Sequence, residues 1–305
     1  MEHIPFLRFW TTLSGGKKSM TYQSMPRTLH GSLEAQQPRT DELLKWYPFK
    51  NELTVDGKIK PTFTDILHTY YWPKTLTDAE RIAYVSEKSG KSEEELSMEL
   101  YRMRRLKMGV AQSIRMKLRG RGFRQPESPD GGMWYGKERA YMMASGGAAS
   151  SFGMSFYNNP TYEPFIVYSP MFQFGGCVDM VLNKPLRTSL QYCLVEVCLH
   201  NSIPKARLPG VVGQPKYPIH MLEPCEWEEI RLRLSVMAIL LKKETYVVDH
   251  VIDGGHKYIG AIVHLYDTHD EDGAINWDIQ ALDLDLDLAE QWLLHYKETI
   301  LGPAN

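Results

Sequence analysis

Two strand-like segments joined by a short polar connection constrain the fold of this 305-residue chain more than any other feature. Residues 171–183 and 189–201 are apolar runs, and each carries one acid in its middle, Asp179 and Glu196 respectively. Side chains alternate between two faces along a strand, so Cys198 shares the face of Glu196. The short connection predicts a hairpin in which Asp179 lies opposite Glu196. Like charges on a buried face repel each other and resist desolvation, and an Mg²⁺ or Mn²⁺ ion between them would relieve both costs.

The remaining patterns predict an α/β (α+β) protein with a central mixed sheet flanked by helices. Apolar residues make up 43% of the chain and charged residues 24%, which is enough to build a core without disulfides or metals. The four cysteines form no CxxC pair, so we expect a reducing compartment, buried thiols and no zinc site. Helices are expected over residues 77–118, with a break at Gly90, and over residues 226–244. Further strands are expected at residues 163–169, 245–253, 257–267 and 283–288, the last followed by a helix capped by Asp287 and Glu290.

Three regions follow from these patterns. Residues 1–57 lack periodicity and are expected to form an N-terminal arm, residues 58–125 a helical basic region, and residues 126–305 the α/β core. The first 33 residues carry four basic residues, several Ser and Thr, and a single acid. This composition favours an import signal and a location in the mitochondrial matrix, and a disordered or partner-bound tail is the alternative.

Residues 102–124 contain nine Arg or Lys residues and no acid. Part of this bias suits the C-terminal end of a helix dipole, but nine cations exceed that need. The segment is therefore predicted to bind the phosphates of RNA or DNA, or else to form a solvated or partner-facing surface. The residues expected to make this contact are Arg102, Arg104, Arg105, Lys107, Arg115, Lys117, Arg119 and Arg121.

Protein partners are expected at the arm, residues 1–57, and at residues 203–224, where five prolines exclude regular structure. No apolar run approaches the roughly 18 residues that a membrane-spanning helix needs, so no membrane contact is expected.

Four short stretches resemble motifs of the PD-(D/E)XK nuclease superfamily, and they follow one another along the chain in the family's order. "FGGCVDMVL" (174–182) and "CLVEVC" (193–198) resemble the Asp strand and the acid-x-Lys strand of the RecB-type branch, which includes the mitochondrial genome maintenance exonucleases. "KPTFTDIL" (60–67) and "KMGVAQS" (107–113) resemble its opening motif and its G-x-x-x-H helix. The resemblance covers roughly residues 60–300 and implies a restriction-endonuclease-like core with Asp179 and Glu196 as metal ligands.

The sequence departs from the family pattern at positions that have functional roles in the family. The lysine of the acid-x-Lys pair is Cys198 here, and the family histidine is Ser113. The helix over 226–244 also lacks the usual Gln. Loss of one preorganised electrostatic donor typically costs ~10²–10³ in rate. Arg231 is the preferred candidate for a replacement cation, ahead of Arg233 and Lys184, and its alternative role is to neutralise a relic site.

Three functions follow as expectations. The first is a catalytically inactive nuclease-fold protein that binds nucleic acid or acts as a scaffold in a mitochondrial ribonucleoprotein, such as a ribosome, an assembly particle or an RNA-processing complex. The second is an active, Mg²⁺-dependent single-strand exonuclease in which Asp179 and Glu196 hold the metal. The third is a structural subunit without nucleic-acid contact. No cofactor is expected for the first and third, and Mg²⁺ for the second.

Overall fold

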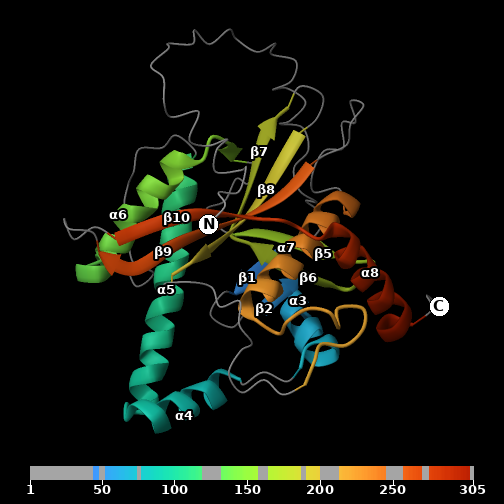
Figure 1. Cartoon of the computed structure of the whole chain (residues 1–305), viewed down its shortest axis with the longest axis horizontal. Coiled ribbons are helices and arrows are strands. Elements are labelled where there is room, and N and C mark those ends of the chain that lie inside the picture. Colours follow the sequence, from blue (N-terminus) through green and yellow to red (C-terminus); the bar gives the residue numbers. More distant parts are fainter. Residues whose placement is uncertain are drawn as a thin grey trace.

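The chain folds around a five-stranded mixed sheet (Figure 1). The computed structural model describes residues 44–47, 52–73, 77–118, 132–156, 164–186, 190–199, 213–244, 257–269 and 275–302. The strand order is β10-β9-β8-β7-β4, in which β8 and β9 are parallel and the other neighbours antiparallel. The strands are β4 (Ser155–Phe156), β7 (Met180–Pro185), β8 (Leu190–Cys198), β9 (Lys257–His269) and β10 (Ile275–Leu282). The predicted α+β class with a mixed sheet is confirmed.

Helices cover both faces of this sheet (Figure 1). One face carries α5 (Glu93–Leu118) and α6 (Gly136–Ser151). The other carries α3 (Phe63–Ile66), the π-helical turn η1 (Leu67–Tyr71), α7 (Glu226–Lys243) and α8 (Leu286–Tyr296), which continues into η2 (Lys297–Leu301). In β8, Val195 and Val197 pack toward α5, whereas Leu194 and Cys198 pack toward α7. Cover on both faces explains why this strand is an almost continuous apolar run.

The predicted boundary near residue 125 does not separate two hydrophobic cores. Leu106 and Ile114 of α5 belong to the same buried cluster as Val195 of β8. Phe63 of α3 lies in the second cluster, together with Trp292 of α8, which its ring contacts at a centroid distance of 5.2 Å. The described parts of the second and third predicted regions therefore share both cores.

The segment predicted as one strand, residues 171–183, is two strands in two sheets. Its first part, β6 (Phe174–Val178), pairs with β5 (Phe165–Ser169), and its second part is β7. The change of sheet falls at Asp179. Close approach of β5 explains the glycine at position 175, because a Cβ there would lie 2.4 Å from the Val167 carbonyl oxygen.

The end of the predicted arm is folded rather than extended. A three-stranded antiparallel sheet consists of β1 (Leu44–Tyr47), β2 (Glu52–Val55) and β3 (Lys58–Lys60). The turn expected at residues 55–58 is confirmed, and Asp56 and Gly57 adopt positive φ angles of 50° and 75°, as Asp-Gly hairpin turns do. Residues 1–43 lie outside the described part of the chain.

The expected helices over residues 77–118 are confirmed as α4 (Asp78–Ser89) and α5. Thr77 and Glu80 form a capping box at the start of α4, and Gly90 ends the helix with a φ of 72°. No helix of the described residues is both long and apolar enough to cross a membrane.

The C-terminal segment differs from its prediction. The last strand, β10, ends at Leu282, before the alternating Asp and Leu residues. These residues lead into α8 instead of forming a strand. Asp285, rather than Asp287, caps this helix, because its side chain accepts a hydrogen bond from the Leu288 N–H at 3.0 Å. The strand predicted at residues 245–253 lies outside the described residues.

Candidate functional site

Asp179 and Glu196 come together where the chain changes sheets. Met180 pairs with Val195 in the antiparallel ladder of β7 and β8, so Asp179, one residue earlier, lies opposite Glu196. The predicted hairpin and its register are thus confirmed. Glu196 is buried, with 4% of its surface exposed, and the Asp179 side chain is 15% exposed.

Asp179 also completes the backbone hydrogen bonding at this point. Its Oδ2 accepts a hydrogen bond from the Val197 N–H at 2.8 Å. Continued pairing of β7 with β8 would bring Val178 opposite Val197, but Val178 pairs with Phe165 of β5 instead. A buried N–H without an acceptor is costly, so the Asp179 carboxylate takes the place of the departing strand.

Two cations reach Glu196 from opposite faces of the sheet. Lys107 on α5 places its Nζ 2.5 Å from Glu196 Oε1 and 3.6 Å from Asp179 Oδ2. Arg233 on α7 places its Nη2 2.8 Å from Glu196 Oε2. These four residues, Lys107, Asp179, Glu196 and Arg233, are called the ion-pair cluster below. Its two acids and two bases balance in number.

The groups of the ion-pair cluster shift each other's pKa. Burial disfavours the charged form of Glu196, but Arg233 and Lys107 outweigh it and hold the pKa of Glu196 below its ordinary value. Burial raises the pKa of Asp179; the charge of Lys107 opposes this rise and that of Glu196 adds to it. Burial also disfavours charge on Lys107 and Arg233, yet the two acids raise the pKa of both cations above their ordinary values. Glu196 therefore keeps its negative charge, and this charge lies at the centre of the ion-pair cluster.

Arg231, the preferred replacement cation, does not contact either acid of the hairpin. Its guanidinium contacts Glu228 at 2.8 Å and Asp285 at 3.7 Å. Arg233 lies two residues further, about 200° around the helix axis, and it is this side chain that faces the sheet. Lys184, the third candidate, pairs in register with Gln191, far along β7 from Asp179.

Two of the three departures from the family motifs, at Ser113 and Cys198, are buried in the packed interior. Ser113, at the histidine position, is buried and accepts a hydrogen bond from the Ser145 hydroxyl at 2.8 Å. Cys198, at the lysine position, shares the face of Glu196 as predicted, and it is packed in the core beneath α7. Burial raises the pKa of the Cys198 thiol.

Burial raises the pKa of Cys177 and Cys193 to about 12 as well, and it raises that of Cys225. Because the thiolate is the reactive form, the native protein is expected to react slowly with a thiol-specific reagent near pH 8, whereas the denatured chain should titrate four thiols. Colourimetric thiol titration with and without denaturant measures this difference. Rapid modification of native Cys198, located by mass spectrometry, would contradict the inert role assigned to it.

The basic residues of α5 are largely engaged within the protein. Lys107 belongs to the ion-pair cluster. Arg115 is 3% exposed, and its Nε donates to the Ala111 carbonyl at 3.0 Å. Arg104 pairs with Asp78 of α4 at 2.6 Å. These three side chains are not presented together as a phosphate-binding surface.

The remaining predicted phosphate contacts are dispersed. Arg105 lies over the Tyr101 ring at 5.5 Å, Arg102 is exposed, and Lys117 is partly exposed near the other end of α5. Arg119 and Arg121 lie outside the described residues. The described part of α5 therefore offers isolated cations rather than a continuous basic stripe.

The donor set of the hairpin does not suit Mg²⁺ as it stands. Mg²⁺ requires free carboxylate oxygens in near-octahedral geometry, but Glu196 uses one oxygen for Lys107 and the other for Arg233, and Asp179 Oδ2 accepts from Val197. Within the described ranges, no group of three or more His, Cys, Asp or Glu residues is placed to hold a metal ion. A metal would have to displace the two cations.

No protein-family model matches the chain, and no curated protein or solved structure is significantly similar to it.

Proposed function

We propose that this chain is a non-catalytic protein of the PD-(D/E)XK nuclease fold that acts as a scaffold in a mitochondrial ribonucleoprotein assembly. The ion-pair cluster carries the proposal. In it, the two acids that would bind a metal in an active nuclease are occupied by Lys107, Arg233 and the Val197 N–H. An acid pair neutralised in this way holds strands and helices together instead of activating water.

The placement of the family-like stretches supports the fold part of the proposal. The stretch at residues 60–67 lies against β6, because the Gly175 N–H donates to the Pro61 carbonyl at 3.2 Å. The helix bearing "KMGVAQS" and the helix over Glu226–Lys243 each send a cation to Glu196. The two helices thus converge on Glu196, and the stretch at residues 60–67 lies beside the strand that leads to Asp179.

The positions of the basic side chains on α5 favour a scaffold role over a nucleic-acid-binding role. Two of the predicted phosphate contacts are engaged within the protein, because the Lys107 ammonium pairs with Glu196 and Arg115 is buried. Affinity for nucleic acid grows with the number of phosphates that exposed cations neutralise, and the described part of α5 presents few. Protein partners within the assembly are therefore the better-supported contacts.

The test is a cleavage assay combined with a metal titration. Purified protein is incubated with end-labelled single-stranded RNA and DNA, with and without millimolar Mg²⁺ or Mn²⁺, and metal binding is measured by calorimetry. We expect intact strands and no binding heat, because a metal must break the contacts of Glu196 with both cations. Mg²⁺-dependent cleavage that Asp179→Ala abolishes would overturn the proposal.

One observation favours the alternative of an active nuclease. The Lys107 ammonium group lies near both acids, where it supplies from α5 the positive charge that Cys198 does not supply from the strand. Under this alternative the same assay shows cleavage that Lys107→Met lowers ~10²–10³-fold. Arg115→Glu is unsuitable for testing nucleic-acid contact because the side chain is buried, whereas Arg102→Glu tests an exposed cation.

A further inference from the structure

The helical hairpin of α4 and the first half of α5 extends away from the sheet (Figure 1). No residue of α4 is buried, although a 12-residue helix gains most of its stability from packing an apolar face. Five large apolar side chains between residues 84 and 103 are at least 40% exposed. They are Tyr84, Val85, Met98, Tyr101 and Met103.

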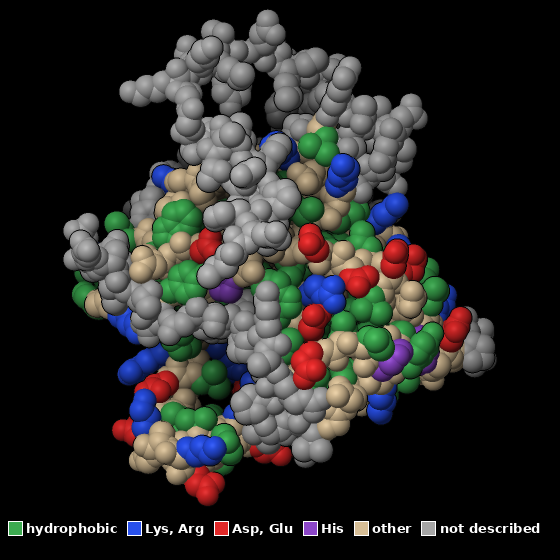
Figure 2. All heavy atoms as spheres, viewed as in Figure 1, with side chains coloured by type: hydrophobic (Ala, Val, Ile, Leu, Met, Phe, Trp, Pro, Cys, Tyr) green, Lys and Arg blue, Asp and Glu red, His purple; other side chains and the backbone are tan. Residues whose placement is uncertain are grey.

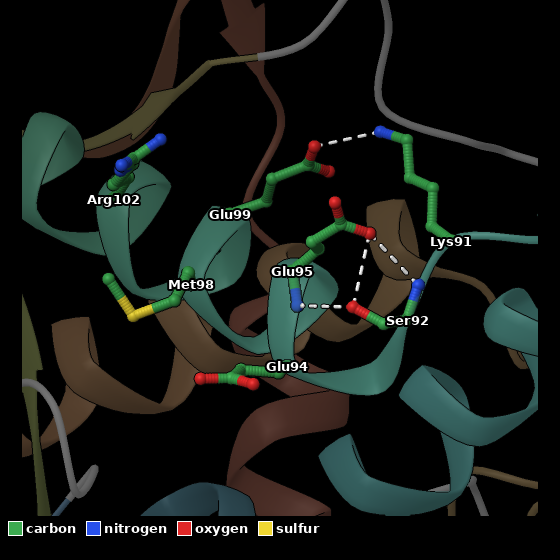
Figure 3. A pocket seen from close by; sticks show the side chains of 7 residues that line it. All are labelled: Lys91, Ser92, Glu94, Glu95, Met98, Glu99 and Arg102. Atoms are coloured by element: carbon green, nitrogen blue, oxygen red, sulfur yellow. Dashed lines mark hydrogen bonds and ion pairs between the residues drawn. The ribbon is translucent and has the colours of Figure 1, made fainter.

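Hydrophobic side chains are interspersed with charged ones at the tip of the hairpin, as Figure 2 shows. A hollow of about 440 Å³ lies where the connection after α4 meets the first turns of α5. The side chains that line it are polar or charged apart from Met98, and the Lys91 ammonium lies 2.7 Å from Glu99 at its wall (Figure 3). Exposed apolar side chains bordered by polar ones, as at this tip, are the usual anatomy of a protein interface.

The net charge of this surface is negative. Residues 78–103 contain seven acids and four bases, a net charge of −3, against −2 for the whole chain. Arg104 pairs with Asp78 and Lys91 with Glu99. Glu87, Glu93 and Glu94 form no ion pair within the part of the chain that the structure describes. Such a surface repels polyanions and attracts cations.

We propose that the α4–α5 tip, residues 78–103, is a docking surface for an amphipathic helix of a partner protein that carries Lys and Arg beside its apolar face. The apolar anchors would be covered by the partner's apolar side chains, as when a helix lies in a groove. The unpaired acids would meet the partner's cations at the rim. This surface lies apart from the ion-pair cluster, so it goes beyond the scaffold function and can fail independently of it.

The probe is a synthetic helix with leucine on one face and lysine along its flanks, and the matched control peptide has glutamate in place of lysine. Fluorescence anisotropy measures binding to the full-length protein at low and moderate salt. We expect the lysine peptide to bind at least about tenfold more tightly, with affinity falling as salt rises. Met98→Asp, and separately Glu93→Lys with Glu94→Lys, should each weaken binding by about tenfold.

Two exposed residues outside the tip provide matched control variants, Met171→Asp and Glu298→Lys, which should leave binding unchanged. Circular dichroism confirms that each variant is folded. Equal binding of both peptides, or binding that Met98→Asp leaves intact, overturns the proposal. So does self-association that Met98→Asp abolishes in sedimentation experiments, because the occupant would then be a second copy of the chain.

Discussion

Replacing Glu196 by alanine is expected to lower the free energy of unfolding by about 3–5 kcal/mol. The change removes the carboxylate that Arg233 contacts at 2.8 Å and Lys107 at 2.5 Å, and so leaves one largely buried and one partly buried cation without their main counterion. Because the pKa of Glu196 is held below its ordinary value, its contribution is present above about pH 4.3 and is lost as the pH falls through the folded-state pKa. Urea denaturation near neutral pH measures the loss.

A surface pair provides the matched control for this substitution. Glu290 contacts Lys243 at 2.9 Å, and about half of its side chain, 52%, is exposed. Glu290→Ala should cost less than about 1 kcal/mol, because solvent screens exposed pairs. If the two alanine variants lose similar amounts, Glu196 has no special structural role.

A double substitution separates loss of charge pairing from loss of packing. Glu196→Leu with Arg233→Met removes one acid and one base and leaves Lys107 facing Asp179. Apolar replacements of a buried ion pair are often neutral or stabilising, so the double variant should be more stable than Glu196→Ala. A double variant less stable than the single one would mean that the pairing is not what makes Glu196→Ala costly.

The sequence predicts the acid pair well because the information is local. Alternation along each strand and a short connection between them determine which side chains face each other, and Asp179 lies opposite Glu196 as expected. The change of sheet at Asp179 has no comparable local signal. It depends on β5 pairing with β6, so the sequence alone predicts a single strand over residues 171–183.

The identity of the cations depends on how two helices approach the sheet, which the sequence specifies only indirectly. A signal exists nevertheless. Lys107 shares the helical spacing of the buried residues Val110 and Ile114, and Arg233 that of Met237. A cation within an apolar stripe requires a buried acid as its partner. The same spacing does not separate Arg233 from Arg231, because Leu234 and Ala238, three and seven residues after Arg231, are buried too.

The substitutions Asp179→Ala and Asp179→Asn together distinguish a structural carboxylate from a metal ligand. Asp179→Ala leaves the buried Val197 N–H without its acceptor, which is expected to lower the free energy of unfolding by about 1–3 kcal/mol. Asparagine retains a carbonyl oxygen that can accept the same hydrogen bond. Asp179→Asn should therefore retain most of the stability that Asp179→Ala loses, as measured by urea denaturation of both variants.

A site selected for metal binding gives the opposite pattern. Acids held close together for catalysis store repulsion, and their removal commonly stabilises a protein while it abolishes activity. If Asp179→Ala were more stable than the unmodified chain, the Asp179 carboxylate would destabilise the fold by charge repulsion. It would not stabilise the fold by replacing the departing strand. The expected loss on Asp179→Ala, recovered with asparagine, therefore supports a cluster that maintains the junction between the two sheets, and a gain would favour the nuclease alternative.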